Sequence, residues 1–369
     1  MTIKYSVGVD IGGTFTDVVC AGSDGSFRLM KRATTRGDPA AAVRDALRAM
    51  RADWGIDPAL IERFVHGSTV ATNAVIERKG ARTGIVTTAG FKDVLEIGRQ
   101  MRRRMYDLVL TPETPVFLAP GARRKEVAER IAADGAIVAP LAEDEVRARA
   151  AELVADDVDS IAIVFLFSFV NPAHERRARD IIAAAHPNLA VSLSSEVDPA
   201  FREYERTAVT AFDAYLKPVV ASYVARMGHD LASAGVPAPL QIMQSRGGIA
   251  AAATAAERPV RLFLSGPAAG IVGGVAAGRD AGSATSSPSI SAAPAATSRW
   301  SRAANRWCAP RVSSTASPCA CRWSTSPRSA PAAAASPGST TPARFASGRN
   351  RPGRSRGRPA MEAAGRKRP

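Results

Sequence analysis

The chain is poor in cysteine and lacks the long apolar runs of secreted or membrane proteins. Of its four cysteines, only Cys20 lies within residues 1–282, which excludes a disulfide-built scaffold there and suits a reducing compartment. The N-terminal sequence MTIKYSVGVDIGG lacks the apolar core of a signal peptide. No stretch of 18 or more apolar residues occurs, so we expect no membrane span. These absences together predict a cytoplasmic protein without a membrane partner.

Acidic residues are almost missing from the C-terminal part of the chain. Residues 283–369 contain 15 lysines and arginines and one acid, Glu362, whereas residues 1–282 contain 34 bases and 33 acids. The net charge of +15 therefore belongs to the tail rather than to the body. The tail is rich in Ala, Ser, Pro and Arg and has no periodic apolar pattern, so it cannot bury a core. We expect residues 283–369 to form a low-complexity, basic, disordered tail.

Strand and helix patterns alternate along residues 1–282, which is typical of an α/β protein. Three apolar, β-branched runs with tight turns predict an antiparallel meander at the N-terminus, and Asp38 is the expected N-cap of the next helix. A later helix is expected to be interrupted near Pro218. The predicted strands are 5–11, 14–21, 27–31, 82–88, 161–170, 190–193 and 239–243, and the predicted helices are 39–50, 143–155, 173–185, 201–234 and 268–277.

The sharpest local signal is VDIGGTFTDVV, residues 9–19. Glycines in the turn let backbone N–H groups approach a phosphate, and threonine hydroxyls add donors. A carboxylate before the turn suits Mg²⁺, which prefers oxygen ligands, or an attacking water. No Gly-Lys-Ser/Thr follows, so this is not a Walker A loop; an ordinary hairpin turn with polar flanks is the alternative. The candidate residues are Asp10, Gly12, Gly13, Thr14, Thr16 and Asp17.

The segment DIGGTFTD resembles the first phosphate loop of the actin-like ATPase superfamily. Three longer blocks, 66–100, 195–218 and 263–274, resemble the hydantoinase A/5-oxoprolinase family and stand in the family's order. The resemblance implies an α/β fold with an incomplete actin-like (ribonuclease H-like) N-terminal lobe. It also implies that residues 1–190 form the family's N-terminal region and that residues 191–282 begin its core region.

This resemblance implies ATP-dependent ring opening of a cyclic amide such as a hydantoin or 5-oxoproline, with ATP and Mg²⁺ as cofactors and a hydantoinase B-type subunit as partner. Relatives of this type also include carboxylases. Asp213 stands where we expect Asn, and Arg246 where we expect Asn or Ser, so the substrate stays open. The alternatives are another small-molecule kinase or ATPase of the actin-like fold, and a non-enzymatic nucleic-acid binder acting through the basic tail.

Two further positions are candidates for the same site. His66, in the block HGST, is predicted to act in catalysis, in contact with substrate or phosphate; a structural histidine is the alternative. Gly266 opens a helix of small residues, whose N-terminus can face an anion such as the nucleotide phosphates. Close packing of the helix would also explain the small residues.

The tail has the composition of a GC-rich gene read out of frame. Permitted codons for residues 284–295 read DVITFDIGGTS in a shifted frame, and those for residues 326–341 read VAAVGAGGGSIAWIDD. Both segments resemble family text, in the same frame and in the family's order. We therefore interpret the chain as truncated by a frameshift, expect impaired activity from it, and do not expect a nucleic-acid partner.

Overall fold

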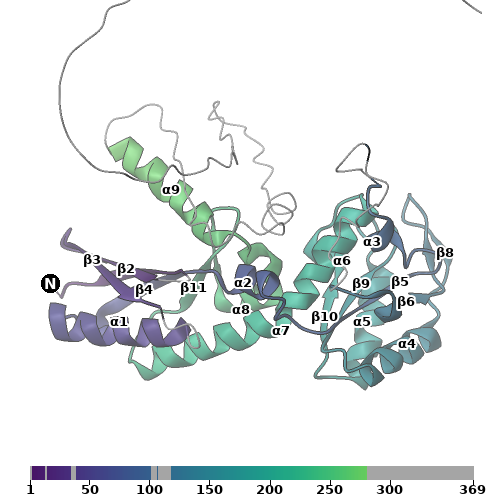
Figure 1. The fold of residues 1–369 in the computed structure, drawn as a ribbon, viewed down its shortest axis with the longest axis horizontal. Coiled ribbons are helices and arrows are strands. Elements are labelled where there is room, and N and C mark those ends of the chain that lie inside the picture. Colours follow the sequence, from purple (N-terminus) through teal and green to yellow (C-terminus); the bar gives the residue numbers. More distant parts are fainter. Residues whose placement is uncertain (1, 13–14, 35–38, 101–105, 107–117, 281–369) are drawn as a thin grey trace, which may run out of the picture. The chain divides into compact units, whose positions relative to one another are not determined.

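The computed structural model describes residues 2–12, 15–34, 39–100, 106 and 118–280. The predictions made for Gly13, Thr14, the N-cap Asp38 and the tail 283–369 lie outside these residues. Within them the chain is an α/β protein, as predicted, and its two main sheets are drawn in Figure 1.

Six strands form the first sheet, in the order β12-β11-β4-β1-β2-β3. The first three strands make the predicted antiparallel meander, whereas β4 lies parallel to β1 and β11 parallel to β4. Because β11 and β12 join this sheet, it draws strands from both sides of residue 190. The strands are β1 (Tyr5–Ile11), β2 (Phe15–Gly22), β3 (Phe27–Ala33), β4 (Ile61–Ser68), β11 (Leu240–Met243) and β12 (Ile249–Ala251).

Alternation along β1 separates the two faces of the first sheet. Val7, Val9 and Ile11 are buried in the core beneath α1 (Pro39–Trp54) and α7 (Glu203–Ser233), which lie on one side of the sheet in Figure 1. Successive side chains of a strand point to opposite faces. Asp10, between two of these core residues, therefore points to the face that α1 does not cover.

The second sheet has four strands in the order β10-β9-β5-β6, and all neighbours are parallel. Helices pack against it, so its strands are apolar runs rather than alternating ones; all five residues of β9 are buried. The strands are β5 (Thr83–Thr88), β6 (Arg124–Val127), β9 (Ser160–Val164) and β10 (Ala190–Leu193), and the helices in contact with them include α4 (Glu143–Ala155), α5 (Ala173–Ala185) and α7.

Two predicted elements differ from the structure. The strand expected over residues 161–170 ends at Val164, because the chain turns at Phe167, whose φ is +54°. The predicted interruption of the long helix is wrong, since α7 continues through Pro218. A proline removes one N–H donor, and buried residues on the adjacent turns, including Leu216 and Val220, hold the helix in the core.

The last helix, α9 (Ser265–Asp280), starts three residues before the predicted start. The remaining elements are short: η1 (Pro58–Leu60), α2 (Val70–Ile76), α3 (Val94–Ile97), η2 (Gly121–Arg123), β7 (Arg130–Ile131), β8 (Ile137–Ala139), α6 (Ser194–Val197), α8 (Ala252–Glu257) and η3 (Pro259–Leu262). Among the described residues, no helix combines the length and the apolar character needed to cross a bilayer.

Candidate functional site

Three segments that are distant in the sequence meet at Asp10. In the first sheet, Asp10 stands opposite Asp17 of β2 and Gly67 of β4. A Cβ atom added to Gly67 would lie 2.9 Å from Oδ1 of Asp10, and one added to Gly266 at the start of α9 would lie 3.7 Å from the same atom. Only glycine therefore fits at position 67, because any side chain there would collide with the Asp10 carboxylate. The structure thus brings together two predicted residues, Asp10 and Gly266.

Asp10 is an exposed residue, and its carboxylate has no hydrogen bond or ion pair with any part of the chain that the structure describes. Partial burial raises the pKa of Asp10, and the charge of Asp17 across the strand pair raises it further. Asp17 itself makes an ion pair with Lys31 at 2.7 Å. An unpaired carboxylate facing a like charge is favoured by a bound cation, which would lower this pKa.

The turn after Asp10 is closed by a backbone hydrogen bond. The N–H of Gly12 donates to the carbonyl of Phe15 at 2.9 Å, and a Cβ on Gly12 would lie 3.1 Å from that oxygen. Thr16 is fully buried, and its hydroxyl shares a 2.9 Å hydrogen bond with that of Thr34. In this geometry the Thr16 hydroxyl is bonded within the protein and is not exposed to a ligand.

His66 lies on the core face of β4, with none of its surface exposed. Its Nδ1 lies 3.2 Å from the carbonyl of Val9 and its Nε2 lies 2.6 Å from the hydroxyl of Tyr223. Nδ1–H therefore donates to the carbonyl, and Nε2 accepts from the tyrosine. Burial lowers the pKa of His66 to about 4, so the ring is neutral near pH 7. Such contacts describe a structural histidine, and the predicted catalytic role gains no support from them.

The residues after His66 join the site instead. Strand alternation pairs His66 with Val9 in the core and Gly67 with Asp10 on the open face, a signal that the sequence already carried. Sequence reasoning chose the histidine from the block HGST because of its chemistry. The small neighbour, which carries no side-chain chemistry, is the residue that lies against the carboxylate.

Hydroxyl side chains tie the segments around Asp10 to one another. Thr69 Oγ1 donates to the carbonyl of Ile11 at 3.2 Å. Ser265, fully buried at the start of α9, donates from Oγ to the carbonyl of Ser68 at 3.1 Å. These contacts fix the end of β1, the end of β4 and the N-terminus of α9. The first N–H groups of a helix are unpaired within it and attract anions, so this corner offers both an anion-binding end and a carboxylate for a cation.

The chain matches two described protein regions. Residues 6–185 match the hydantoinase/oxoprolinase N-terminal region, and residues 206–286 match hydantoinase/oxoprolinase. The two matches include Asp10, Gly67 and Gly266. The first match ends at residue 185 and the second begins at residue 206.

Two characterised relatives and two solved structures are similar to the chain. Caprolactamase subunit alpha from Pseudomonas jessenii is 36% identical over 271 residues, which cover 72% of this chain and 39% of the relative. The 5-oxoprolinase of Saccharomyces cerevisiae is 29% identical, over 72% of this chain and 23% of the relative. The crystal structure of the ATP-dependent caprolactamase gives a TM-score of 0.69 at 34% identity, covering 75% of this chain and 41% of that one.

The nucleotide-free structure of acetone carboxylase, which carries out ATP-dependent acetone carboxylation, gives a TM-score of 0.68 at 27% identity. It covers 76% of this chain and 41% of that one. The chain therefore spans about two fifths of these proteins or less.

Proposed function

Because the chain belongs to the hydantoinase/oxoprolinase family, we propose that it is the nucleotide-binding N-terminal part of an enzyme that opens a cyclic amide at the expense of ATP. Its α/β fold is that of an actin-like ATPase lobe. The relatives are ATP-dependent amide hydrolases and carboxylases, which supports ATP use. One observation carries the proposal: the Asp10 carboxylate lies beside both a glycine of β4 and the N-terminus of α9.

The residues present fit a magnesium–nucleotide complex. The described residues contain no group of three or more His, Cys, Asp or Glu side chains that would hold a metal by themselves. Mg²⁺ often takes only one or two protein carboxylates and fills its other positions with water and phosphate oxygens. Asp10 would supply the carboxylate, and the backbone of the turn at Gly12, Gly13, Thr14 and Thr16 would face the phosphates, with Asp17 in support. A side chain at position 67 would crowd this carboxylate, since a Cβ there would lie 2.9 Å from Oδ1 of Asp10.

ATP would supply the phosphoryl group that turns the poorly reactive amide oxygen into a leaving group. The residues of this chain would orient and neutralise charge rather than react. Gly266 and the first turn of α9 would donate N–H groups toward phosphate oxygens, while Asp10 would hold the cation or orient a water. His66 would act indirectly: its contact with the Val9 carbonyl positions the strand that carries Asp10.

Two further elements of the proposal concern the whole enzyme. Subunit names among the relatives, such as caprolactamase subunit alpha, support a partner subunit of the hydantoinase B type. A two-lobed actin-like fold clamps ATP between two phosphate loops, and residues 1–282 contain the first. We propose that the second phosphate loop is encoded downstream in the shifted frame. The chain as written would then bind ATP weakly. The active enzyme would be the frame-restored protein, working in the cytoplasm.

The decisive test compares the chain as written with a frame-restored protein. Each is purified and assayed with MgATP and hydantoin, 5-oxoproline or caprolactam, with and without a B-type subunit from the same source. We expect ATP-dependent ring opening from the restored protein, and none from its Asp10→Ala variant. ATP hydrolysis that is stimulated by a sugar or small acid rather than by any cyclic amide would favour the kinase alternative.

A further inference from the structure

The start of α9 is placed by a short lead-in, residues 259–266, that contacts several elements. Leu264 in this lead-in has φ +56°, a left-handed conformation that a leucine adopts only when its neighbours hold it. Its N–H lies 3.4 Å from Thr72 Oγ1, and the ring of the preceding residue, Phe263, meets Phe212 of α7 edge-on at 5.8 Å. The position of Gly266 beside Asp10 therefore depends on how the lead-in is held.

The upstream end of the lead-in is held by Asp213, a carboxylate of α7 with no exposed surface. Its Oδ1 accepts a hydrogen bond from the N–H of Val260 at 3.1 Å. Val260 is the second residue of the single turn η3, and first-turn N–H groups have no partner within a helix. The buried carboxylate supplies the acceptor that this backbone group needs.

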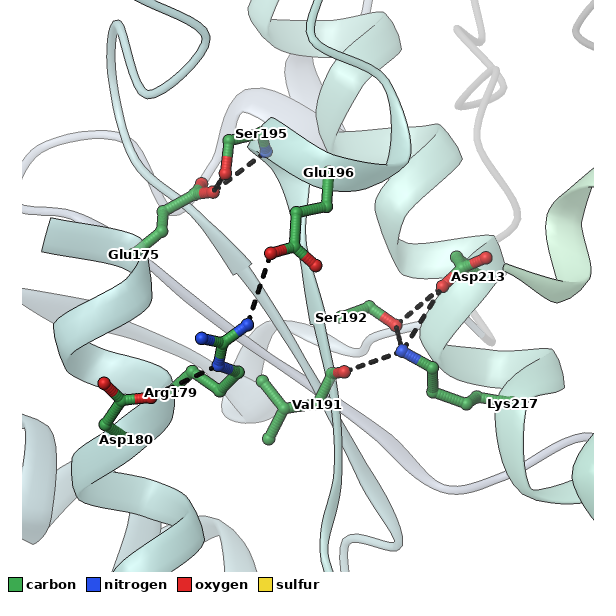
Figure 2. Close-up of polar contacts among 9 residues, drawn as sticks. All are labelled: Glu175, Arg179, Asp180, Val191, Ser192, Ser195, Glu196, Asp213 and Lys217. Carbon is green, nitrogen blue, oxygen red and sulfur yellow. Dashed lines mark hydrogen bonds and ion pairs between the residues drawn. The ribbon is translucent and has the colours of Figure 1, made fainter. Parts of the chain in front are cut away.

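The other oxygen of Asp213 reaches the second sheet. Its Oδ2 accepts a 2.7 Å hydrogen bond from the hydroxyl of Ser192 in β10, as Figure 2 shows. Lys217, one turn along α7, lies 3.9 Å from the same oxygen and donates to the carbonyl of Val191 at 2.8 Å. One side chain thus contacts the edge strand of the second sheet and the lead-in to α9.

Neighbouring positive charges and hydrogen bonds offset the cost of burying the Asp213 carboxylate. Burial raises the pKa of Asp213, and the ammonium of Lys217 is the strongest opposing influence, aided by the hydrogen bonds from Ser192 and Val260 and by Arg258. Burial in turn lowers the pKa of Lys217, which the carboxylate of Asp213 opposes. A buried carboxylate is costly unless it is paired and hydrogen-bonded. Here both oxygens are used, and each contact is to a different part of the fold.

We propose that Asp213 is a positioning residue of the phosphate site: it fixes Val260, and thereby sets Gly266 and the N-terminus of α9 against Asp10. The phosphate site itself rests on the function proposed above. Through its other oxygen, the same carboxylate accepts the hydrogen bond from Ser192 of β10.

The experiment measures amide hydrogen exchange by mass spectrometry in the full chain, together with MgATP affinity by titration calorimetry. Asp213→Ala removes the acceptor, and Val260→Pro removes the donor while leaving Asp213 with Ser192 and Lys217. Proline fits the first turn of a helix, so the second variant remains informative where the first fails to fold. Asp213→Asn keeps an acceptor for Val260 and is the conservative rescue.

The matched control is Glu175→Ala. Glu175 is also a fully buried carboxylate, and it accepts hydrogen bonds from Ser194, Ser195 and the N–H of Phe165 (Figure 2 draws those of Ser195). None of these partners belongs to the lead-in. Its loss should loosen the region around the second sheet without changing exchange in residues 260–266.

We expect Asp213→Ala and Val260→Pro to speed exchange in residues 261–266 roughly ten-fold or more and to weaken MgATP binding. Asp213→Asn should restore both, and the double variant should add little to either single change. Unchanged exchange in residues 261–266 in both single variants overturns the positioning role. Frame-restored protein that binds no MgATP counts against the proposed function, and the exchange measurements then decide the role of Asp213 by themselves.

Discussion

At the scale of single residues, the candidate site is a carboxylate that has no hydrogen-bond or ion-pair partner among the residues that the structure describes. Asp10 lies directly across the strand pair from Asp17, and like charges in that position oppose each other. Such an arrangement costs stability, and a bound cation removes the cost. It is typical of a binding site rather than of a structural ion pair.

Asp10→Asn should therefore stabilise the free protein while removing MgATP binding. The asparagine relieves the repulsion from Asp17, which amounts to a few tenths of a kcal/mol for an exposed cross-strand pair. Because the pKa of Asp10 is raised, this gain should be present above the folded-state pKa and shrink as the pH falls through it. Thermal unfolding at pH 7 and pH 4 measures the gain in stability and its decrease in acid. A lower unfolding temperature for the variant at pH 7 would contradict the interpretation, and Asp53→Asn serves as the exposed control.

His66 should make the fold sensitive to mild acid. Its pKa is about 4 in the folded protein and about 6.5 when unfolded, so between these values the unfolded chain binds more protons. Stability should therefore fall as the pH drops from 7 to 5, with His66 contributing about 2 kcal/mol of the loss.

Urea unfolding of the wild type and of His66→Gln at the two pH values isolates this contribution. The glutamine variant should be less stable at pH 7 but lose less stability on acidification. Equal losses in the two proteins would show that His66 is not the buried neutral group described here.

At the scale of elements, the site depends on close approach between backbones. β1 and β4 run parallel, with Asp10 opposite Gly67, and the N-terminus of α9 lies on the same open face. Neither strand alone makes a site. The glycine matters because the neighbouring strand carries a carboxylate at that register position.

Gly67→Ala should displace the Asp10 carboxylate, because the new Cβ would lie 2.9 Å from Oδ1. We expect a loss of about 1–3 kcal/mol in unfolding free energy and weaker MgATP binding. Gly8→Ala is the matched control: it lies on the same face of β1, and a Cβ there meets nothing within 4 Å. Urea unfolding and calorimetry compare the two variants. Equal changes in unfolding free energy and in MgATP affinity would show that the missing side chain at Gly67 has no role.

The long helix α7 gives a prediction of opposite sign. Pro218 lies inside it without ending it, so one backbone carbonyl of the preceding turn lacks its helical donor. Pro218→Ala restores that donor and should raise the free energy of unfolding by about 1 kcal/mol or more. A decrease, measured by urea unfolding, would mean that the proline ring contributes contacts that outweigh the missing hydrogen bond.

At the scale of the whole molecule, the chain matches two regions of the hydantoinase/oxoprolinase family, and the proposal above assigns it the first of two phosphate loops. The chain spans 39% of the caprolactamase subunit that it resembles. ATP hydrolysis in an actin-like enzyme requires charge neutralisation from both sides of the nucleotide. The continuation of the chain therefore decides whether this lobe can act.

DNA from the source, read across the codons for residues 275–291, should show one base added or dropped, with a second DIGGT segment in the restored frame. The protein as written should then show no ATP-dependent hydrolysis above that of its Asp10→Ala variant. If the DNA confirms the chain, the basic tail itself becomes the subject of test. Nucleic-acid binding that falls steeply with salt and vanishes on deletion of residues 283–369 would then support the binding alternative.

Sequence alone determined the fold class, most of the elements and the location of Asp10, because these follow from local patterns. Alternation defines β1, and the spacing of apolar residues defines α4 and α5, which match the predicted bounds. At Pro218, packing of the neighbouring turns in the core outweighed the local preference. After Val164, the strand ends because the chain turns at Phe167, whose φ is +54°. The family itself was indicated by the resemblance of three longer sequence blocks, 66–100, 195–218 and 263–274.

Only the tertiary structure decided which side chains share a site. It separated Gly67 from His66, since one faces the Asp10 carboxylate and the other lies in the core. It also placed Gly266 and Asp213, which come from distant parts of the chain, at two ends of one lead-in. Sequence patterns report the face of an element that a residue occupies. The partner across that face is set by how parallel strands and long helices pack, and no local pattern encodes it.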